Sequence, residues 1–151
     1  MKMKGISSVL TIAITTVFWI SLNIFHTEAV MTVEQIQNMV KPLGKSCASK
    51  VGLSPELQEA HRNGQFPEDR TLMCYLHCLG KLTKNIDKNN NIDVEGKIKQ
   101  LKMALPEELI PSSINAYNTC FLKATSEDPC EKSYQFAKCY YETDAKTYFF
   151  P

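Results

Sequence analysis

Apolar residues along the chain recur mostly every three or four positions, the period of a helix that buries one face. The first such segment follows the capping-box sequence TVEQ at 32–35 and is expected to close at Gly44. The segment 72–79 is apolar nearly all round, as in a helix at the centre of a bundle. No segment shows a convincing strand pattern, so the periodicity favours helices throughout.

Local signals mark where further helices begin. Three are expected to start at an N-cap residue, namely at Ser54, Asp93 and Asp128. Another is expected to start at Ser112 or Ser113, after a linker that holds two prolines. The sequence therefore predicts an all-α fold, a compact bundle of about six helices.

The first 29 residues carry a different pattern. Lys2 and Lys4 precede an apolar run at 6–24, and the small-residue exit TEA follows at 27–29. This order is typical of a secretory signal peptide, and a membrane anchor is the alternative because the run is long enough to span a bilayer. The expected mature protein is residues 30–151, secreted and extracellular, with no stable membrane insertion.

Six cysteines behind a signal peptide predict three disulfides. Cys74 and Cys78 lie four residues apart on one helix face, so they are expected to bridge to two different segments. Cys130 and Cys139 are nine apart and are expected to point to opposite sides of their helix. Spacing alone leaves the pairing open. A metal held by Cys74, Cys78 and His77 is the alternative, but an oxidising compartment favours disulfides, so no metal is expected.

Charge and motifs argue against several function classes. The formal net charge is +1, and it falls to zero without Lys2, Lys4 and Glu28, so neither nucleic acid nor an anionic membrane is favoured as a partner. The chain has three histidines and lacks the GxSxG, HExxH and calcium-loop motifs. The adjacent acids Glu107 and Glu108 are typical of a helix N-terminus. No cofactor and no enzyme activity are expected, and a small secreted hydrolase is kept only as an alternative.

The spacing of the cysteines, counted in intervening residues, is C-x26-C-x3-C-x41-C-x9-C-x8-C. This spacing resembles that of the six-cysteine insect odorant-binding proteins, whose signature is the three-residue and eight-residue gaps. The signal peptide, the mature length and the helical pattern agree with that family over the whole mature chain. The stretches MTVEQ at 31–35, LMCY at 72–75 and AKC at 137–139 are similar to its LUSH-type, alcohol-binding branch, as is the tail of twelve residues after Cys139.

The resemblance implies the disulfides Cys47–Cys78, Cys74–Cys130 and Cys120–Cys139. It also implies a carrier that binds small hydrophobic volatile molecules, odorants or pheromones, in an internal apolar pocket and transports them through aqueous lymph. An olfactory receptor is the implied further partner, the sensillum lymph the implied location, and a monomer or weak homodimer the implied state. Where the LUSH-type branch carries alcohol-binding hydroxyl residues this chain has Gly80 and Asn85, which argues against short alcohols as ligands.

The candidate pocket residues are apolar side chains of the predicted helices and loops, a few hydrogen-bonding side chains, and two phenylalanines of a tail, 140–151, that is expected to fold back over the bundle. They are Leu76, Leu79, Thr83, Asn85, Ile86, Ile92, Ile98, Leu101, Tyr117, Phe121, Phe136, Tyr140, Phe149 and Phe150. For each residue plain core packing is the alternative. His77 is either a pH sensor or simply a packed helix residue. The alternative function is a toxin-like or effector protein that acts by protein–protein interaction without a ligand cavity.

Overall fold

The computed structural model describes residues 30–151, so the predicted signal peptide lies outside the described residues. Six α-helices follow one another, with a short 3-10 helix before α6 and another after α7. They are α2 (Val33–Val51), α3 (Pro55–Arg62), α4 (Arg70–Leu82), α5 (Val94–Ala104), η1 (Glu107–Leu109), α6 (Ile110–Lys123), α7 (Pro129–Thr143) and η2 (Ala145–Thr147). Within 30–151 the only β pairing is an isolated bridge between Ile86 and Ile92. The predicted all-α fold is confirmed.

Four of the helices begin as their sequence signals predict. The side chains of Thr32, Ser54, Asp93 and Asp128 each accept a hydrogen bond from a backbone N–H in the first turn of the following helix. At Thr32 the capping box is complete, because the Gln35 side chain also accepts from the Thr32 backbone N–H. No helix in the described part of the chain is long and apolar enough to cross a membrane.

Two predicted helix boundaries are wrong. Helix α2 does not close at Gly44 but continues to Val51, and Gly52 ends it with a φ of 72°. Helix α6 begins at Ile110 rather than at a serine, because Pro111 is well suited to a first turn. Ser113 is instead buried inside α6, where its hydroxyl donates to the Leu109 carbonyl over 2.7 Å.

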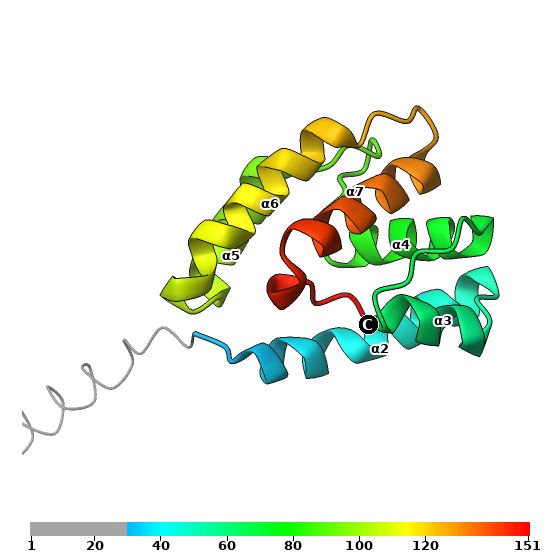
Figure 1. Ribbon diagram of the computed structural model, residues 1–151, viewed down its shortest axis with the longest axis horizontal. Coiled ribbons are helices and arrows are strands. Elements are labelled where there is room, and N and C mark those ends of the chain that lie inside the picture. Colours follow the sequence, from blue (N-terminus) through cyan, green and yellow to red (C-terminus); the bar gives the residue numbers. More distant parts are fainter. Residues whose placement is uncertain (1–29) are drawn as a thin grey trace, which may run out of the picture.

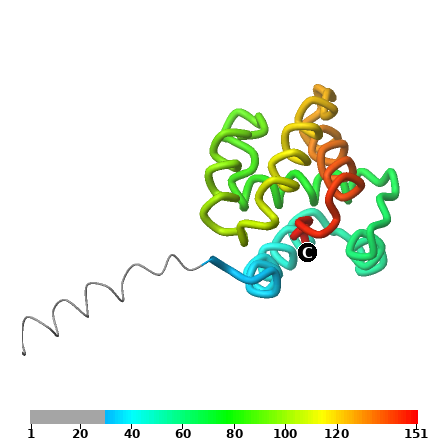
Figure 2. The backbone as a smooth tube through the Cα atoms, turned by 60° about the vertical axis from the view of Figure 1, so that its left-hand side comes forward, coloured from blue at the N-terminus to red at the C-terminus, as the bar shows by residue number. Residues whose placement is uncertain are grey.

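The helices form two packed groups that share α7. Helices α5 and α6 lie side by side and lean on α7, whereas α2 and α3 lie on the other side of α4 (Figure 1). One apolar core joins α5, α6 and α7 around Tyr117 and Phe136, and a second joins α2, α4 and α7 around Leu72 and Tyr75. The C-terminal segment runs back from α7 towards α2, between these groups (Figure 2).

Three disulfides link the helices, and they are the pairs that the resemblance implies. Cys47–Cys78 joins α2 to α4, Cys74–Cys130 joins α4 to α7, and Cys120–Cys139 joins α6 to α7. As the helix geometry predicts, Cys74 and Cys78 reach different helices. Helix α7 is thus tied on one side to α4 and on the other to α6, which fixes it in the middle of the bundle.

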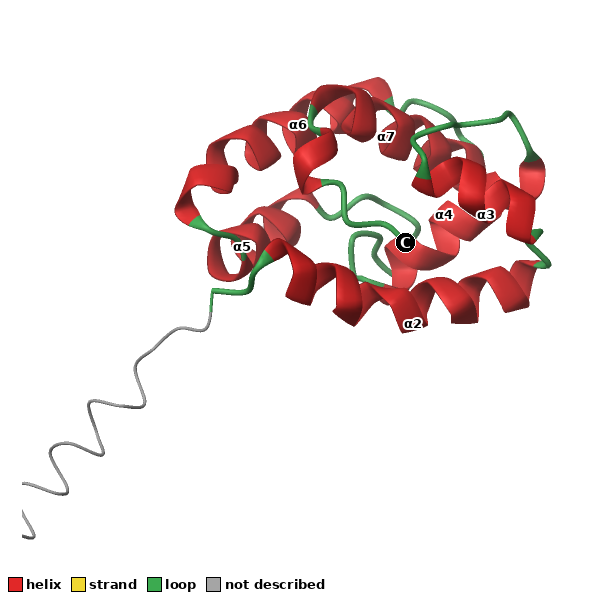
Figure 3. Cartoon of the chain, turned by 60° about the horizontal axis from the view of Figure 1, so that its bottom comes forward, coloured by secondary structure: helices red, strands yellow, loops and turns green. Residues whose placement is uncertain are grey.

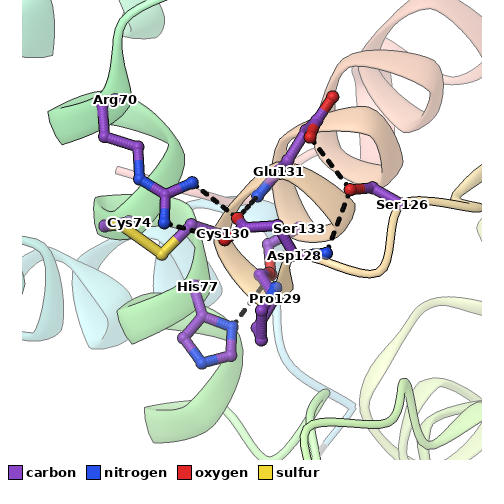
Figure 4. Close-up of polar contacts among 9 residues, drawn as sticks. All are labelled: Arg70, Cys74, His77, Ser126, Asp128, Pro129, Cys130, Glu131 and Ser133. Carbon is purple, nitrogen blue, oxygen red and sulfur yellow. Dashed lines mark hydrogen bonds and ion pairs between the residues drawn. A yellow bond between two sulfur atoms is a disulfide. The ribbon is translucent and has the colours of Figure 1, made fainter.

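The junction between α4 and α7 carries a polar cluster beside the Cys74–Cys130 bridge (Figure 4). The Arg70 guanidinium donates to both carboxylate oxygens of Asp128, over 2.6 and 2.9 Å. These hydrogen bonds hold the pKa of Asp128 well below its usual range. His77 Nδ1 lies 3.1 Å from the Ser133 hydroxyl, on the same junction. His77 therefore faces another helix and does not line the cavity described below.

Candidate functional site

The C-terminal tail folds back into the bundle (Figure 3). Helix α7 extends to Thr143, so Tyr140 is a helix residue and the returning segment comprises 144–151 rather than 140–151. The Thr147 hydroxyl donates to Asp144 Oδ2 over 2.8 Å and lies 3.0 Å from the Tyr140 hydroxyl. These contacts turn the chain sharply after α7 and direct its last four residues inward.

The end of the tail is anchored by contacts with three helices. The Tyr148 hydroxyl lies 2.6 Å from His61 Nε2 of α3, and the Tyr75 hydroxyl of α4 donates to the Pro151 carbonyl. On α2, a Cβ placed on Gly44 would lie 2.5 Å from the Pro151 ring, so only glycine leaves room there. Gly44 therefore serves tail docking and not helix termination.

The folded-back tail closes one wall of a cavity of about 360 Å³. This volume lies within the usual range for sites that enclose a small molecule. The rest of the wall comes from α2, α5, α6, α7 and the end of α4. Met39 and Leu82 line the cavity and are about half exposed, so they mark its opening to solvent. The cavity is thus an apolar hollow that the protein's own last residues cover.

The structure brings most of the predicted pocket residues together. Eight line the cavity, namely Thr83, Asn85, Leu101, Tyr117, Phe136, Tyr140, Phe149 and Phe150. Three more line a small hollow of about 20 Å³ that shares Asn85, Tyr117, Phe136 and Phe150 with the main cavity. These three are Leu76, Ile86 and Ile92.

Three predicted pocket residues lie elsewhere. Leu79 is fully buried in the core between α2, α4 and α7. Ile98 does not line the cavity, because the side of α5 that faces it consists of residues 97, 100, 101 and 104. Phe121 is 42% exposed on the outer surface of α6, because the buried face of that helix follows 113, 116, 117 and 120.

Helix α2 contributes to the cavity although none of its residues is among the candidates taken from the sequence. Its residues Ile36, Met39, Val40 and Leu43 line the cavity at helical spacing. The spacing of this apolar stripe predicts an amphipathic helix, but it does not indicate whether the stripe packs against a filled core or lines a cavity. Lys97 and Tyr148, which also line the cavity, carried no sequence signal that singles them out.

Two buried polar side chains face the cavity without a protein hydrogen-bond partner in the described part of the chain. They are Asn85, through its Oδ1 atom, and Tyr117, through its hydroxyl. Burial raises the pKa of Tyr117, so its hydroxyl keeps its proton and can donate. Thr83 and Tyr140 are already engaged, with the Leu79 carbonyl and the Thr147 hydroxyl respectively. The wall between the two hollows therefore offers a place for a polar ligand group.

His61, which supports the tail, is expected to make the stability of the fold depend on pH. It is 1% exposed, and burial lowers its pKa to about 4, aided by Arg62 and opposed by a contact with the Pro151 backbone. In the unfolded chain the imidazole binds a proton near pH 6.5, so the unfolded state binds more protons between the two values. The free energy of unfolding should therefore fall by up to about 3 kcal/mol as the pH drops from about 6.5 to about 4.

Urea unfolding at several pH values measures this effect. The variant His61→Gln should flatten the dependence, whereas His77→Gln, which changes a half-buried histidine outside the cavity, should leave most of it. An identical loss of stability on acidification in wild type and His61→Gln would assign the effect to other groups.

The PBP/GOBP family matches residues 29–143. General odorant-binding protein 72 of Anopheles gambiae is 24% identical over 79% of this chain and 98% of its own length. The structure of Apis mellifera odorant binding protein 5 is 33% identical and superimposes with a TM-score of 0.71, covering 80% of this chain and 98% of that one. Odorant Binding Protein 4 of Chrysopa pallens is 29% identical, with a TM-score of 0.71 over 80% of this chain and 99% of that one.

Proposed function

Because the chain belongs to the PBP/GOBP family, we propose that it is a secreted carrier that holds one small hydrophobic volatile molecule in its cavity and transports it through aqueous lymph towards receptors. Odorants or pheromones are the ligand class. The observation that carries this proposal is the apolar hollow of about 360 Å³ in which the protein's own tail forms one wall. Family members are carriers, so the protein is not an enzyme.

The cavity supports a carrier rather than a protein that acts only by binding other proteins. Side chains that line an apolar hollow lose packing contacts on that side. A core of this size that was filled by side chains would therefore be more stable than one that contains a hollow. Three disulfides offset that cost by restricting the unfolded chain. A stapled helical shell around a hollow is therefore suited to hold a guest molecule.

Within this proposal the ligand contacts are the residues that line the two hollows. Phe136, Leu101, Phe149 and Phe150 supply apolar surface, and Asn85 with Tyr117 supplies the polar end. The protein acts in the sensillum lymph as a monomer or weak homodimer, and an olfactory receptor receives the ligand or the loaded carrier.

The test is a competition binding series with unbranched primary alcohols of increasing length. Each added methylene should tighten binding about fourfold, the equivalent of about 0.8 kcal/mol of apolar burial, until the cavity is full. Beyond that length the affinity should fall because the opening at Met39 and Leu82 must then hold the excess chain.

A matched pair of variants checks where the ligand binds. Leu101→Gln places a polar amide in the cavity wall, whereas Leu122→Gln changes a leucine that is 75% exposed on α6. Only the first should weaken binding. Equal affinities along the alcohol series, or equal effects of the two substitutions, would refute an enclosed apolar site.

A further inference from the structure

We propose that Lys97 makes this cavity a site for aldehydes, which it captures as a reversible imine. This inference rests on the proposed carrier function and names a ligand class for it. Binding of an apolar ligand does not require a lysine in the cavity wall, and the proposal gives this lysine a covalent role.

Lys97 occupies the cavity face of α5, one helical turn before Leu101. Its side chain is only partly exposed, although lysine side chains normally extend into water. Its ammonium makes one polar side-chain contact, a 3.2 Å hydrogen bond to Gln100 Oε1. A lysine placed in this way faces the hollow and whatever occupies it.

Nothing in the cavity wall neutralises a charge on Lys97. The residues that line the cavity include no aspartate or glutamate. Within 30–151 the ion pairs are Arg62–Glu59 and Arg70–Asp128, neither of which involves Lys97. An ammonium that is partly removed from water and has no counter-ion is destabilised, so the site shifts the equilibrium towards the neutral amine.

The neutral amine is the form that attacks a carbonyl. Burial lowers the pKa of Lys97 to about 8. At pH 7 about a tenth of the Lys97 side chains are then neutral, whereas an ordinary lysine with a pKa of 10.4 is neutral in fewer than about one molecule in a thousand. The cavity therefore raises the reactive fraction of this one lysine by at least about a hundredfold.

The reaction needs no further reactant. The Lys97 Nζ lone pair adds to the aldehyde carbon, and the carbonyl oxygen takes up a proton to form a carbinolamine. Loss of the hydroxyl group with the remaining nitrogen proton releases one water and leaves a C=N bond in place of C=O. Apolar walls disfavour the return of that water, whereas exposure to bulk water hydrolyses the imine and releases the aldehyde unchanged.

Lys84 provides an internal control, because it lines the same cavity. It lies in the turn after α4, has a φ of 56° and is exposed to solvent. Lys84 therefore has water around its ammonium and lacks the burial that favours the neutral amine in Lys97. The two lysines differ in environment and share access to the ligand.

The experiment uses decanal with the full-length protein at pH 7 and sodium cyanoborohydride, which converts an imine into a stable secondary amine. Intact mass spectrometry should show one decyl group added per protein, and peptide mapping should place it on Lys97. The variant Lys97→Met should lose the adduct. The control variant Lys99→Met, which changes an exposed lysine of α5 outside the cavity, should keep it. An excess of 1-decanol, which cannot form an imine, should suppress the adduct by occupying the cavity.

The possible outcomes distinguish the imine proposal from the carrier function. An adduct spread over surface lysines, or one that 1-decanol does not suppress, overturns the imine proposal. Binding of 1-decanol with no adduct at Lys97 also overturns it and leaves the carrier function intact. If neither molecule binds, the carrier function fails as well, so the two proposals can be separated.

Discussion

A protein that ends at Thr147 is expected to lose about a thousandfold in affinity for apolar ligands while it keeps its helices. The deletion removes Tyr148, Phe149 and Phe150, three aromatic residues of the cavity wall. If each ring contributes roughly 1.5 kcal/mol of apolar contact to the complex, the loss is about 4.5 kcal/mol, which is about three orders of magnitude in the dissociation constant. Competition binding with the best ligand, together with circular dichroism, measures the affinity and the helix content.

Two full-length variants make this test independent of the deletion. Tyr148→Phe removes the hydroxyl that contacts His61 but keeps the ring, so the affinity should change little. The double variant Phe149→Ala/Phe150→Ala leaves the backbone of the tail in place and should reproduce most of the loss. An unchanged dissociation constant in a well-folded truncated protein would remove the tail from the site.

Removal of the Cys74–Cys130 disulfide is expected to lower the free energy of unfolding by about 4 kcal/mol. This bridge closes the longest loop of the three, because its two cysteines have a sequence separation of 56. Loop-closure entropy in the unfolded chain grows with the logarithm of that length, so the 19-residue Cys120–Cys139 loop should cost only about 3 kcal/mol when opened. Losses of this size are large against typical net stabilities of about 5–15 kcal/mol.

Paired alanine variants test the ranking under oxidising conditions. Cys74→Ala/Cys130→Ala and Cys120→Ala/Cys139→Ala are compared with wild type by urea unfolding at neutral pH. Cys120 and Cys139 are buried, whereas Cys74 and Cys130 are half-buried. Packing lost on substitution should therefore be greater for the Cys120–Cys139 pair, which opposes the predicted ranking of the two stability losses. A smaller loss for the Cys74–Cys130 pair would therefore point to packing rather than chain entropy as the main contribution of these bridges.

The local elements of this protein could be predicted from its sequence. Capping residues such as Thr32, Ser54 and Asp93 act on backbone groups two or three positions away, so their effect is visible in the sequence itself. The four-residue step from Cys74 to Cys78 likewise determines that both point to one side of a helix. Such short-range geometry is enough to predict the fold class. It also predicts that Cys74 and Cys78 form disulfides with cysteines of two different segments.

Errors arose where a residue has two possible uses and only distant contacts choose between them. Gly44 could end a helix or admit a neighbouring chain, and the choice depends on Pro151, more than one hundred positions away. Phe121 and Tyr117 are one helical turn apart on α6, yet one is exposed and the other lines the cavity. Rotating the buried stripe of α6 by less than half a turn would exchange an exposed position for a buried one. Helical periodicity alone does not determine the position of the stripe to that precision.

Amino-acid sequence alone thus determined the helices, their caps and the side of each helix on which the cysteines lie, because these depend on residues within about one turn of one another. Tertiary structure alone decided which apolar stripes face a hollow and which face a solid core. It also decided that Lys97 is half-buried at the cavity and that His61 supports the tail, since burial depends on every element packed around a side chain. The path of residues 144–151 completes the cavity, and that path depends on α2, α3 and α4 together.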